Sequence, residues 1–258
     1  MRHRRSSIVD RPSSIVAILC VLCVWISFTS PAAAQERFRF AANIGQQATT
    51  TDISEVQTFE QYFEDGRFTF ERTTPKDVFY DASVGVRVWR GLQAGLAVSF
   101  FDNSGSGNVE ASVPHPLQFN KPRTTESELA GITRRELGQH ITVGWIIPAA
   151  ANIDFTIFGG PSFFITEQTF VTGLTMSLDK EVFPFTTLAF PGASTAIERE
   201  TVIGYNAGVD MAWRFADHIG VGALLRYTAG KKDFEPTGAT VEVNVGGLHA
   251  GGGVRVSF

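Results

Sequence analysis

The sequence predicts an all-β protein, an eight-stranded antiparallel up-and-down transmembrane β-barrel with short periplasmic turns and long extracellular loops. Three observations support this fold class. Eight segments alternate apolar residues with small or polar ones, as strands with a single apolar face do. Short and long connections between these segments follow each other in strict alternation. An apolar run typical of an export signal precedes the first segment.

Residues 1–34 are predicted to be a secretory signal peptide, and residues 35–258 the barrel domain. The first part combines four arginines, an apolar run of fourteen residues over 15–28 and three alanines before Gln35. That run is short for a transmembrane helix, so an uncleaved anchor is the weaker alternative. Both cysteines lie inside the run, which leaves the predicted mature chain without disulfides.

The charge of the chain argues against nucleic acid as a partner. The precursor has a formal net charge of −4, and losing the four arginines and one aspartate of the signal leaves about −7. The remaining sequence has no basic stripe. An acidic chain of this kind is poorly suited to bind a phosphate backbone.

The first four predicted strands carry an apolar residue at every second position. Mostly small or polar residues lie between them, so each strand has one apolar face and one small or polar face. The apolar sets run from Phe38 to Ile44, from Val78 to Val88, from Leu92 to Phe100 and from Ile141 to Ile147.

The last four predicted strands repeat this pattern. Phe158 and Phe164 are exceptions, because they place large apolar side chains on the small and polar face. Before the final strand, Val245 has the opposite parity to Leu248, so a β-bulge is expected near Gly246. The apolar sets run from Ile153 to Ile165, from Ile203 to Trp213, from Ile219 to Tyr227 and from Leu248 to Phe258.

The connections predict the orientation of the barrel. In transmembrane barrels the short turns face the periplasm and the longer loops face outside. Tight links occur at 90–91, 148–152 and 216–218. The long connections are polar and cover about 46–76, 102–136, 167–199 and a shorter 230–243.

The apolar face of the strands is predicted to contact lipid. The strands of a soluble barrel with an apolar interior would show the same alternation. The composition of the second face therefore decides between a soluble and a transmembrane barrel. Glycine, alanine and serine dominate that face, which suits the crowded lumen of eight strands better than a solvated coat. Aromatic residues fall towards strand ends, as interfacial girdles do. They include Tyr80, Phe100, Trp145, Trp213, Phe215 and Tyr227.

The closing segment GGGVRVSF ends on Phe258 and resembles the terminal strand of small eight-stranded outer-membrane β-barrels of Gram-negative bacteria, of the outer membrane protein A, X and W types. The likeness of pattern covers nearly all of residues 35–258. It implies a location in the cell outer membrane, contact with its lipid and lipopolysaccharide, and recognition of Phe258 by the outer-membrane assembly machinery. We expect a monomer.

Charged and histidine side chains of the second face are predicted to form a polar network in the lumen. Arg39, Arg87 and Arg255 should lie at the periplasmic end with few acids nearby, and Asp210 should lie diagonal to Arg226. Charges in a narrow lumen need partners or water. A structural plug of ion pairs is therefore favoured over a hydrated, cationic mouth that selects anions. The network comprises Arg39, Asp81, Arg87, His140, Asp154, Asp210, Arg214, Arg226, His249 and Arg255.

No cofactor, metal site or catalytic site is predicted. The histidines of the mature chain fall on separate elements, without the close spacing that binds zinc. His140 and Thr142 share one face, but no carboxylate orients them as nucleophilic catalysis requires. The glycines at 246–247 and 251–253 lack the strand-to-helix setting of a phosphate loop.

Two long connections, 46–76 and 167–199, are candidates for contact with a surface partner. The first contains Asp65–Gly66 flanked by aromatic residues, which predicts a hairpin with its turn at that pair. The second contains EVFPFTTLAFPG, which is too apolar for a freely solvated loop. It either packs over the barrel mouth or neighbouring loops, or forms an exposed contact surface.

These observations favour a structural or surface-interaction role carried by the long loops. A narrow channel for small solutes across the outer membrane is the alternative. The two differ in the lumen, which side-chain pairing would plug. Catalysis is not expected.

Overall fold

The computed structural model describes residues 37–48, 51–175, 183, 185, 192–234 and 241–258. These residues belong to one compact unit, Glu36–Phe258. The predicted signal peptide lies outside the described residues. Within them, no helix is long and apolar enough to cross a membrane.

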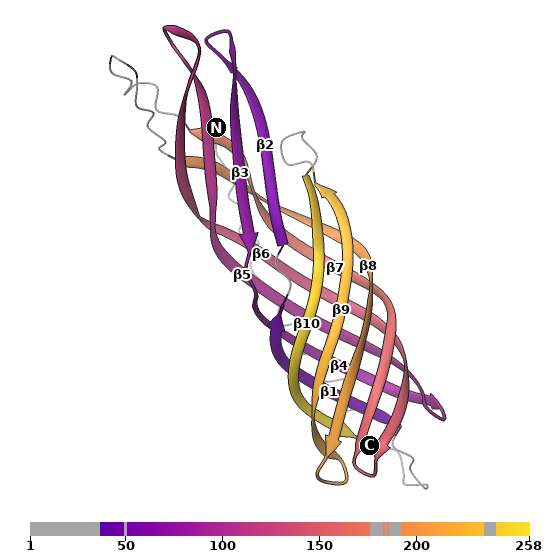
Figure 1. The fold of residues 1–258 in the computed structure, drawn as a ribbon. Helices are drawn as coiled ribbons and strands as arrows, with labels where there is room; N and C mark the ends of the chain where they lie inside the picture. Colours follow the sequence, from indigo (N-terminus) through magenta and orange to yellow (C-terminus); the bar gives the residue numbers. More distant parts are fainter. Residues whose placement is uncertain (1–36, 49–50, 176–182, 184, 186–191, 235–240) are drawn as a thin grey trace, which may run out of the picture. The chain divides into compact units, whose positions relative to one another are not determined.

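Ten antiparallel strands make up the unit (Figure 1). The first five are β1 (Phe38–Gln47), β2 (Thr51–Gln61), β3 (Glu64–Thr74), β4 (Asp77–Trp89) and β5 (Leu92–His115). The last five are β6 (Gln118–Ala150), β7 (Ile153–Thr175), β8 (Gly192–Arg214), β9 (Ile219–Phe234) and β10 (Val241–Ser257).

Eight of these strands close a barrel, as the sequence predicts. Each of β4 to β10 pairs with its neighbour in chain order, and β1 joins β4 to β10, which closes the ring. The other two strands form a hairpin inserted between β1 and β4. Its strand β3 pairs with the distal part of β5, where Arg67–Glu71 face Asn108–Ser112.

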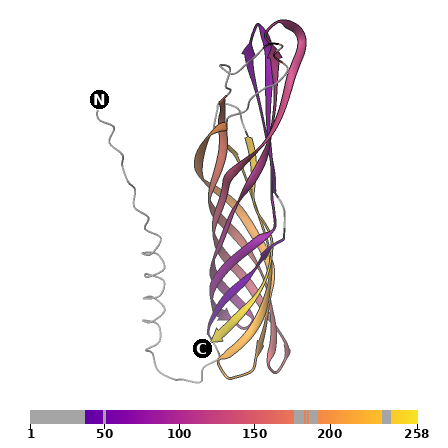
Figure 2. The same ribbon diagram turned by 90° about the vertical axis from the view of Figure 1, so that its left-hand side faces the viewer.

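The long connections differ from the prediction of loops, because they are mostly strands that continue beyond the barrel (Figure 2). β5 and β6 stay paired as far as His115 and Gln118, and β7 and β8 as far as Thr175 and Gly192. Sequence periodicity identifies a strand by its single apolar face. The extended strands bury one face around a core that includes Phe68, Phe70 and Val109, but glycines and charged residues interrupt the alternation of their sequence. We call the strands beyond the lipid belt the extension.

The first hairpin also turns at a different place from the one predicted. Gln61 pairs with Glu64, so Tyr62 and Phe63 form the turn and Asp65–Gly66 lies inside β3. Both turn residues have positive φ, 53° and 64°, as a type I′ turn requires. Gly66 instead makes room for an aromatic ring, because a Cβ there would lie 2.4 Å from the ring of Phe59.

The expected bulge near Gly246 is wrong. β9 and β10 pair residue for residue through Gly246 and Gly247, although both glycines have positive φ. The parity of the preceding valines has another cause, because Val241, Val243 and Val245 point inward. They join a buried apolar cluster that also contains Ile53, Phe164, Phe170, Val202 and Phe234. The interior therefore changes from a polar lumen to an apolar core within the extension.

The outward face of the barrel forms a belt of exposed apolar side chains. Water cannot solvate such a belt favourably, so its solvent is the hydrocarbon of a bilayer. Tryptophans and Phe258 lie at the periplasmic strand ends, and Tyr80, Tyr205 and Tyr227 lie towards the other border. The chain is thus an outer-membrane β-barrel. The belt includes Ile44, Val86, Leu96, Val143, Ile157, Ile203, Val209, Val221, Leu225 and Val254.

Phe258 is fixed at the seam where the barrel closes. Its backbone N–H donates to the carbonyl of Phe38 at 2.9 Å, and its own carbonyl oxygen accepts from Arg37 and Phe38. Its ring lies 6.3 Å from that of Phe40 and stacks on His218 at 5.7 Å. The last residue is therefore part of the β1–β10 junction, which prevents the fraying usual at a chain end.

Candidate functional site

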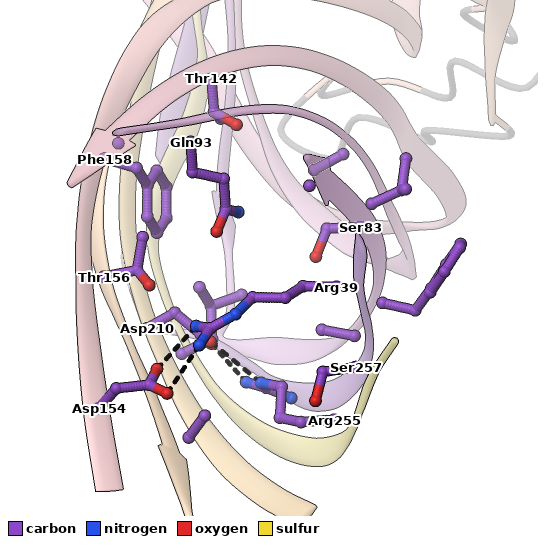
Figure 3. Close-up of a pocket in the computed structure, with 18 of the residues that line it drawn as sticks. Arg39, Ser83, Gln93, Thr142, Asp154, Thr156, Phe158, Asp210, Arg255 and Ser257 are labelled. Atoms are coloured by element: carbon purple, nitrogen blue, oxygen red, sulfur yellow. Dashed lines mark hydrogen bonds and ion pairs between the residues drawn. The ribbon is translucent and has the colours of Figure 1, made fainter. Parts of the chain in front are cut away.

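The periplasmic end of the lumen contains two ion pairs between strands that are not hydrogen-bonded neighbours (Figure 3). Arg39 on β1 donates two hydrogen bonds of 2.7 Å to Asp154 on β7. Arg214 on β8 lies 3.5 Å from the same carboxylate. Arg255 donates to Asp210 through Nε at 3.1 Å and through a second nitrogen at 2.5 Å.

These contacts correct the expectation that the arginines have few acids nearby. Arg39 on β1 reaches Asp154 on β7, four strands away, and Arg255 on β10 reaches Asp210 on β8, beyond the intervening β9. An eight-stranded lumen is narrow enough for side chains to fill it. A long guanidinium side chain can therefore reach carboxylates that are remote in strand order. Arg87 lies at the periplasmic rim, in a depression that it lines with Asn152, Arg214 and Asp217.

A small cavity lies immediately above these ion pairs. Its polar lining includes Ser83, Gln93, Thr142 and Thr156, and Phe158 covers part of it (Figure 3). The centres of water molecules can occupy about 70 Å³ of this space. This exceeds the roughly 10–15 Å³ that a cavity needs to hold one water molecule. The cavity can therefore act as a wet vestibule.

A further ion pair fills the lumen above the vestibule. Arg226 on β9 donates to Asp81 on β4 at 2.5 Å, and Asn43 donates to the same carboxylate at 3.0 Å. The expected diagonal partner of Arg226, Asp210, is occupied by Arg255 instead. Phe158 stacks under the Arg226 guanidinium at 5.5 Å.

Both lumen histidines lie in the next layer. His249 stacks on Phe79 with ring centroids 4.8 Å apart. His140 is hydrogen bonded on both ring nitrogens, to Ser99 at 2.9 Å and to Ser162 at 2.8 Å. Sequence reasoning paired His140 only with Thr142 and missed the two serines. A serine hydroxyl beside a histidine can support nucleophilic catalysis. Ser99 and His140 are both buried away from solvent, so we interpret this contact as structural.

A further polar layer closes the lumen where the barrel meets the extension. Arg134 donates through Nε to Glu136 at 2.7 Å and through another nitrogen to the carbonyl of Asn244 at 2.6 Å. Glu136 also accepts from the backbone of Gly246 at 3.0 Å. The prediction assigned residues 102–136 to a loop and therefore missed this pair. The signal was present, because both residues share the parity of His140.

The layers together exclude a water-sized passage along the described part of the lumen. Arg134 is 0% exposed, His140 1% and Arg226 2%. A continuous aqueous pore would leave such inward side chains in contact with water. Above them, the apolar cluster of Val243 and Phe170 covers the mouth. The described part of the lumen is therefore packed, with the vestibule as a cavity large enough for water.

One buried carboxylate lies in the extension, beside that apolar cluster. Glu55 on β2 is buried, and its carboxylate accepts a hydrogen bond of 3.4 Å from the backbone N–H of Val171. Removal from water raises the pKa of Glu55 to about 7. Among the described residues, no group of three or more His, Cys, Asp or Glu side chains could hold a metal ion.

The distal end of the extension consists of turns that expose apolar side chains. Phe63 is 92% exposed in the β2–β3 turn, and Phe119 is 72% exposed beside the β5–β6 turn. The two turns are tied together, because the backbone of Asn120 donates to Glu64 at 2.6 Å. We call the exposed residues Tyr62, Phe63, Leu117, Phe119 and Phe183 the tip.

The third long connection reaches the same region. The rings of Phe183 and Phe185 lie 6.0 Å apart, and Phe185 meets His115 edge to face at 6.2 Å. Arg123 on β6 donates to the carbonyl of Phe185 at 3.3 Å. Phe185 thus packs against the neighbouring hairpin, while Phe183 is exposed. Most of the apolar stretch predicted as a contact surface lies outside the described residues.

Solved structures similar to this chain are outer-membrane barrels. Neisserial surface protein A is 11% identical over 86% of this chain and 97% of its own, with a TM-score of 0.39. OprG of Pseudomonas aeruginosa is 9% identical over 86% and 97%, with a TM-score of 0.44. Ail of Yersinia pestis, the attachment invasion locus protein, is 10% identical over 85% and 99%, with a TM-score of 0.32. No family model and no curated protein matches the chain.

Proposed function

We propose that this outer-membrane β-barrel serves as a closed membrane anchor for a rigid extension that contacts another surface. The observation that carries the proposal is the contrast between its two ends. The lumen is filled by ion pairs and buried rings, which gives the barrel stability but little room for transport. The extension is a paired β-sheet whose end exposes bulky apolar side chains to water.

The rigidity of the extension supports a contact role. Its hairpins are joined side by side through β3 and β5 and share a buried core of Phe68, Phe70, Val109, Ile132 and Val171. A flexible loop that ordered on binding would lose conformational entropy. A sheet that is already ordered holds its tip in place before contact. Such preorganisation favours a binding role over a mere covering of the barrel.

The alternative, a narrow channel, has less support. The vestibule has room for water and is rimmed by arginines, which would suit an entrance for anions. Beyond it, however, Asp81 and Arg226 bridge opposite walls, and His140 and Arg134 are buried. A solute would have to break several buried pairs to pass. We propose that the vestibule is a blind pocket, and that the chain has no catalytic role.

We further propose that the barrel contacts membrane lipid, lipopolysaccharide and the outer-membrane assembly machinery, and that it does not bind nucleic acid. Exposed cross-strand ion pairs stand just beyond the apolar belt, where the headgroups of lipid and lipopolysaccharide lie. The fixed position of Phe258 suits recognition by the outer-membrane assembly machinery before closure. The apolar belt surrounds the barrel, which supports a monomer. The ion pairs are Arg135–Asp102 at 3.0 Å, Arg199–Glu167 at 3.4 Å and Lys232–Glu200 at 3.7 Å.

Retention of cells on coated surfaces tests the contact role. Residues 57–68 and 108–128 are each replaced by Asn-Gly, which joins strands that already face each other at Val56–Thr69 and Gly107–Leu129. Gram-negative cells displaying equal amounts of folded wild type or variant are washed over glass coated with protein, glycan or lipid. We expect about tenfold lower retention of the variant on at least one coating, because many weak contacts act together. Equal retention on all three coatings would refute the proposal.

A further inference from the structure

The tip combines exposed aromatic side chains with strained backbone. Among the described residues, five that are not glycine have positive φ, and four of them lie in or near the tip. Tyr62 has φ 53°, Phe63 64°, Asn120 56° and Phe185 60°. The left-handed region is unfavourable for side chains with a Cβ, and bulky residues are genuine outliers there. Such strain tends to persist where a function needs it.

The β2–β3 turn shows this conflict most clearly. A two-residue type I′ turn is best served by Asn-Gly, which adopts positive φ at little cost. Here Tyr62 and Phe63 occupy both positions, and Phe63 is almost fully exposed. Neither residue stabilises the turn through its backbone preference, and the Phe63 ring makes little contact with the protein. Tyr62 and Phe63 are therefore unfavourable in the isolated protein, because their backbone is strained and the Phe63 ring is exposed to water.

The shape of the tip favours a lipid surface over a protein pocket. Its apolar side chains project from the ends of separate hairpins, which Figures 1 and 2 show at the opposite end of the unit from the C-terminus. Exposed apolar turns of this kind can enter the interface of a bilayer, where aromatic rings are favoured. From Phe100 at the belt border to His115, β5 spans about 50 Å at the usual rise per residue. The tip therefore cannot reach back to its own membrane.

The charges around the tip select the kind of lipid. Glu60, Asp65, Glu110 and Glu126 are exposed on the hairpins beneath it, against the exposed cations Arg67 and Lys121. Glu110 and Glu126 even face each other across β5 and β6, an arrangement of like charges that disfavours pairing. An anionic membrane would be repelled by this acidic collar. A zwitterionic headgroup, whose outermost charge is a cation, would meet carboxylates of complementary charge.

We propose that the tip docks onto a zwitterionic lipid bilayer, with its apolar side chains in the interface and the acidic collar at the headgroup cations. This inference rests on the proposed contact role and names the surface contacted. Docking removes Phe63, Leu117 and Phe119 from water. This burial would account for bulky apolar residues in turns where their backbone is strained. The bilayer is that of an apposed membrane, because the extension points away from its own.

Flotation with lipid vesicles tests the inference. The refolded barrel in nanodiscs is mixed with phosphatidylcholine vesicles, and the floated fraction is measured against lipid concentration. The test variant Tyr62→Asn/Phe63→Gly, combined with Phe119→Ser, keeps the hairpin geometry and removes the three aromatic side chains of the two hairpin turns. We expect its vesicle partition to fall by about a hundredfold, from the usual contribution of burying the two most exposed of these rings, Phe63 and Phe119. The matched control Val56→Ser alters an exposed apolar residue of β2 away from the tip and should bind as the wild type does.

Two further readouts make the test specific. Replacing a third of the phosphatidylcholine by phosphatidylserine should weaken wild-type binding roughly tenfold, and the variant Glu60→Gln/Asp65→Asn should reduce that loss. The Asn-Gly turn should also resist thermal opening better than the native turn, since it relieves strain. Loss of vesicle binding can then not be attributed to misfolding.

The possible outcomes separate the two proposals. Binding that depends on the tip and weakens with phosphatidylserine supports the inference. Wild type that ignores phosphatidylcholine vesicles, or prefers anionic ones, overturns it. If retention on protein or glycan still depends on the extension, the contact role survives and the tip binds a macromolecule instead. If retention is also unchanged, both proposals are wrong.

Discussion

Replacing Asp81 with alanine is expected to destabilise the folded barrel by about 3–5 kcal/mol, because Arg226 would remain as a buried charge without its carboxylate. Arg226 is 2% exposed, and Asp81 is the acid that it contacts at 2.5 Å. Asn43 would lose the same acceptor. The measurement is the free energy of unfolding in urea, followed by tryptophan fluorescence and by heat-modifiable gel mobility.

Two controls make the Asp81 result interpretable. Asp102→Ala breaks an exposed ion pair with Arg135, and such pairs contribute about 0–1 kcal/mol. The double variant Asp81→Leu/Arg226→Met replaces the buried pair by apolar side chains and should regain most of the lost stability. A stability of Asp81→Ala within about 1 kcal/mol of the wild type would mean that water reaches Arg226, contrary to the packed lumen.

Introducing a side chain at Gly253 is expected to prevent closure of the barrel. A Cβ at this position would lie 1.8 Å from the carbonyl oxygen of Ala42 on β1, which is backbone and cannot move aside cheaply. Gly253 pairs with Asn43 in the seam between β1 and β10. Gly253→Ala should therefore cost about 3 kcal/mol or more and greatly lower the folded fraction after refolding.

The neighbouring residue supplies a matched control. Gly252 has the outward parity, and the nearest atom to a Cβ there is the carbonyl oxygen of Gly222 at 3.3 Å. Gly252→Ala adds the same methyl group on the lipid side and should fold with nearly wild-type yield. Similar yields for both variants would show that the seam is looser than the structure indicates.

The sequence predicts the barrel because lipid imposes a simple pattern. Residues such as Leu96 and Val143 must be apolar at every second position, and Gly95 or Thr142 must be small enough for the lumen. Phe258 extends that pattern to the end of the chain. The extension escapes the same reasoning, since it lies in water and its interior is an apolar core. Hence Val241, Val243 and Val245 suggested a bulge that does not exist.

Side-chain partners in the lumen are harder to predict than the faces of the strands. Parity places Arg39, Asp154, Arg226 and Asp81 inside the barrel, but it does not say how far each side chain reaches. Their pairing depends on the closed ring of eight strands. In this ring β1 and β7 share no backbone hydrogen bonds, but their side chains meet across the lumen. Arg134 was missed for another reason: its strand continues beyond the lipid belt.

Single-channel recording tests directly whether the lumen of the folded barrel is packed. The refolded mature protein is added to a planar bilayer after heat-modifiable mobility confirms that it is folded. The packed layers around Arg226, His140 and Arg134 predict a silent bilayer in symmetrical salt. Discrete, reproducible conductance steps from folded protein would contradict the account and would make the arginines of the vestibule the entrance of a channel.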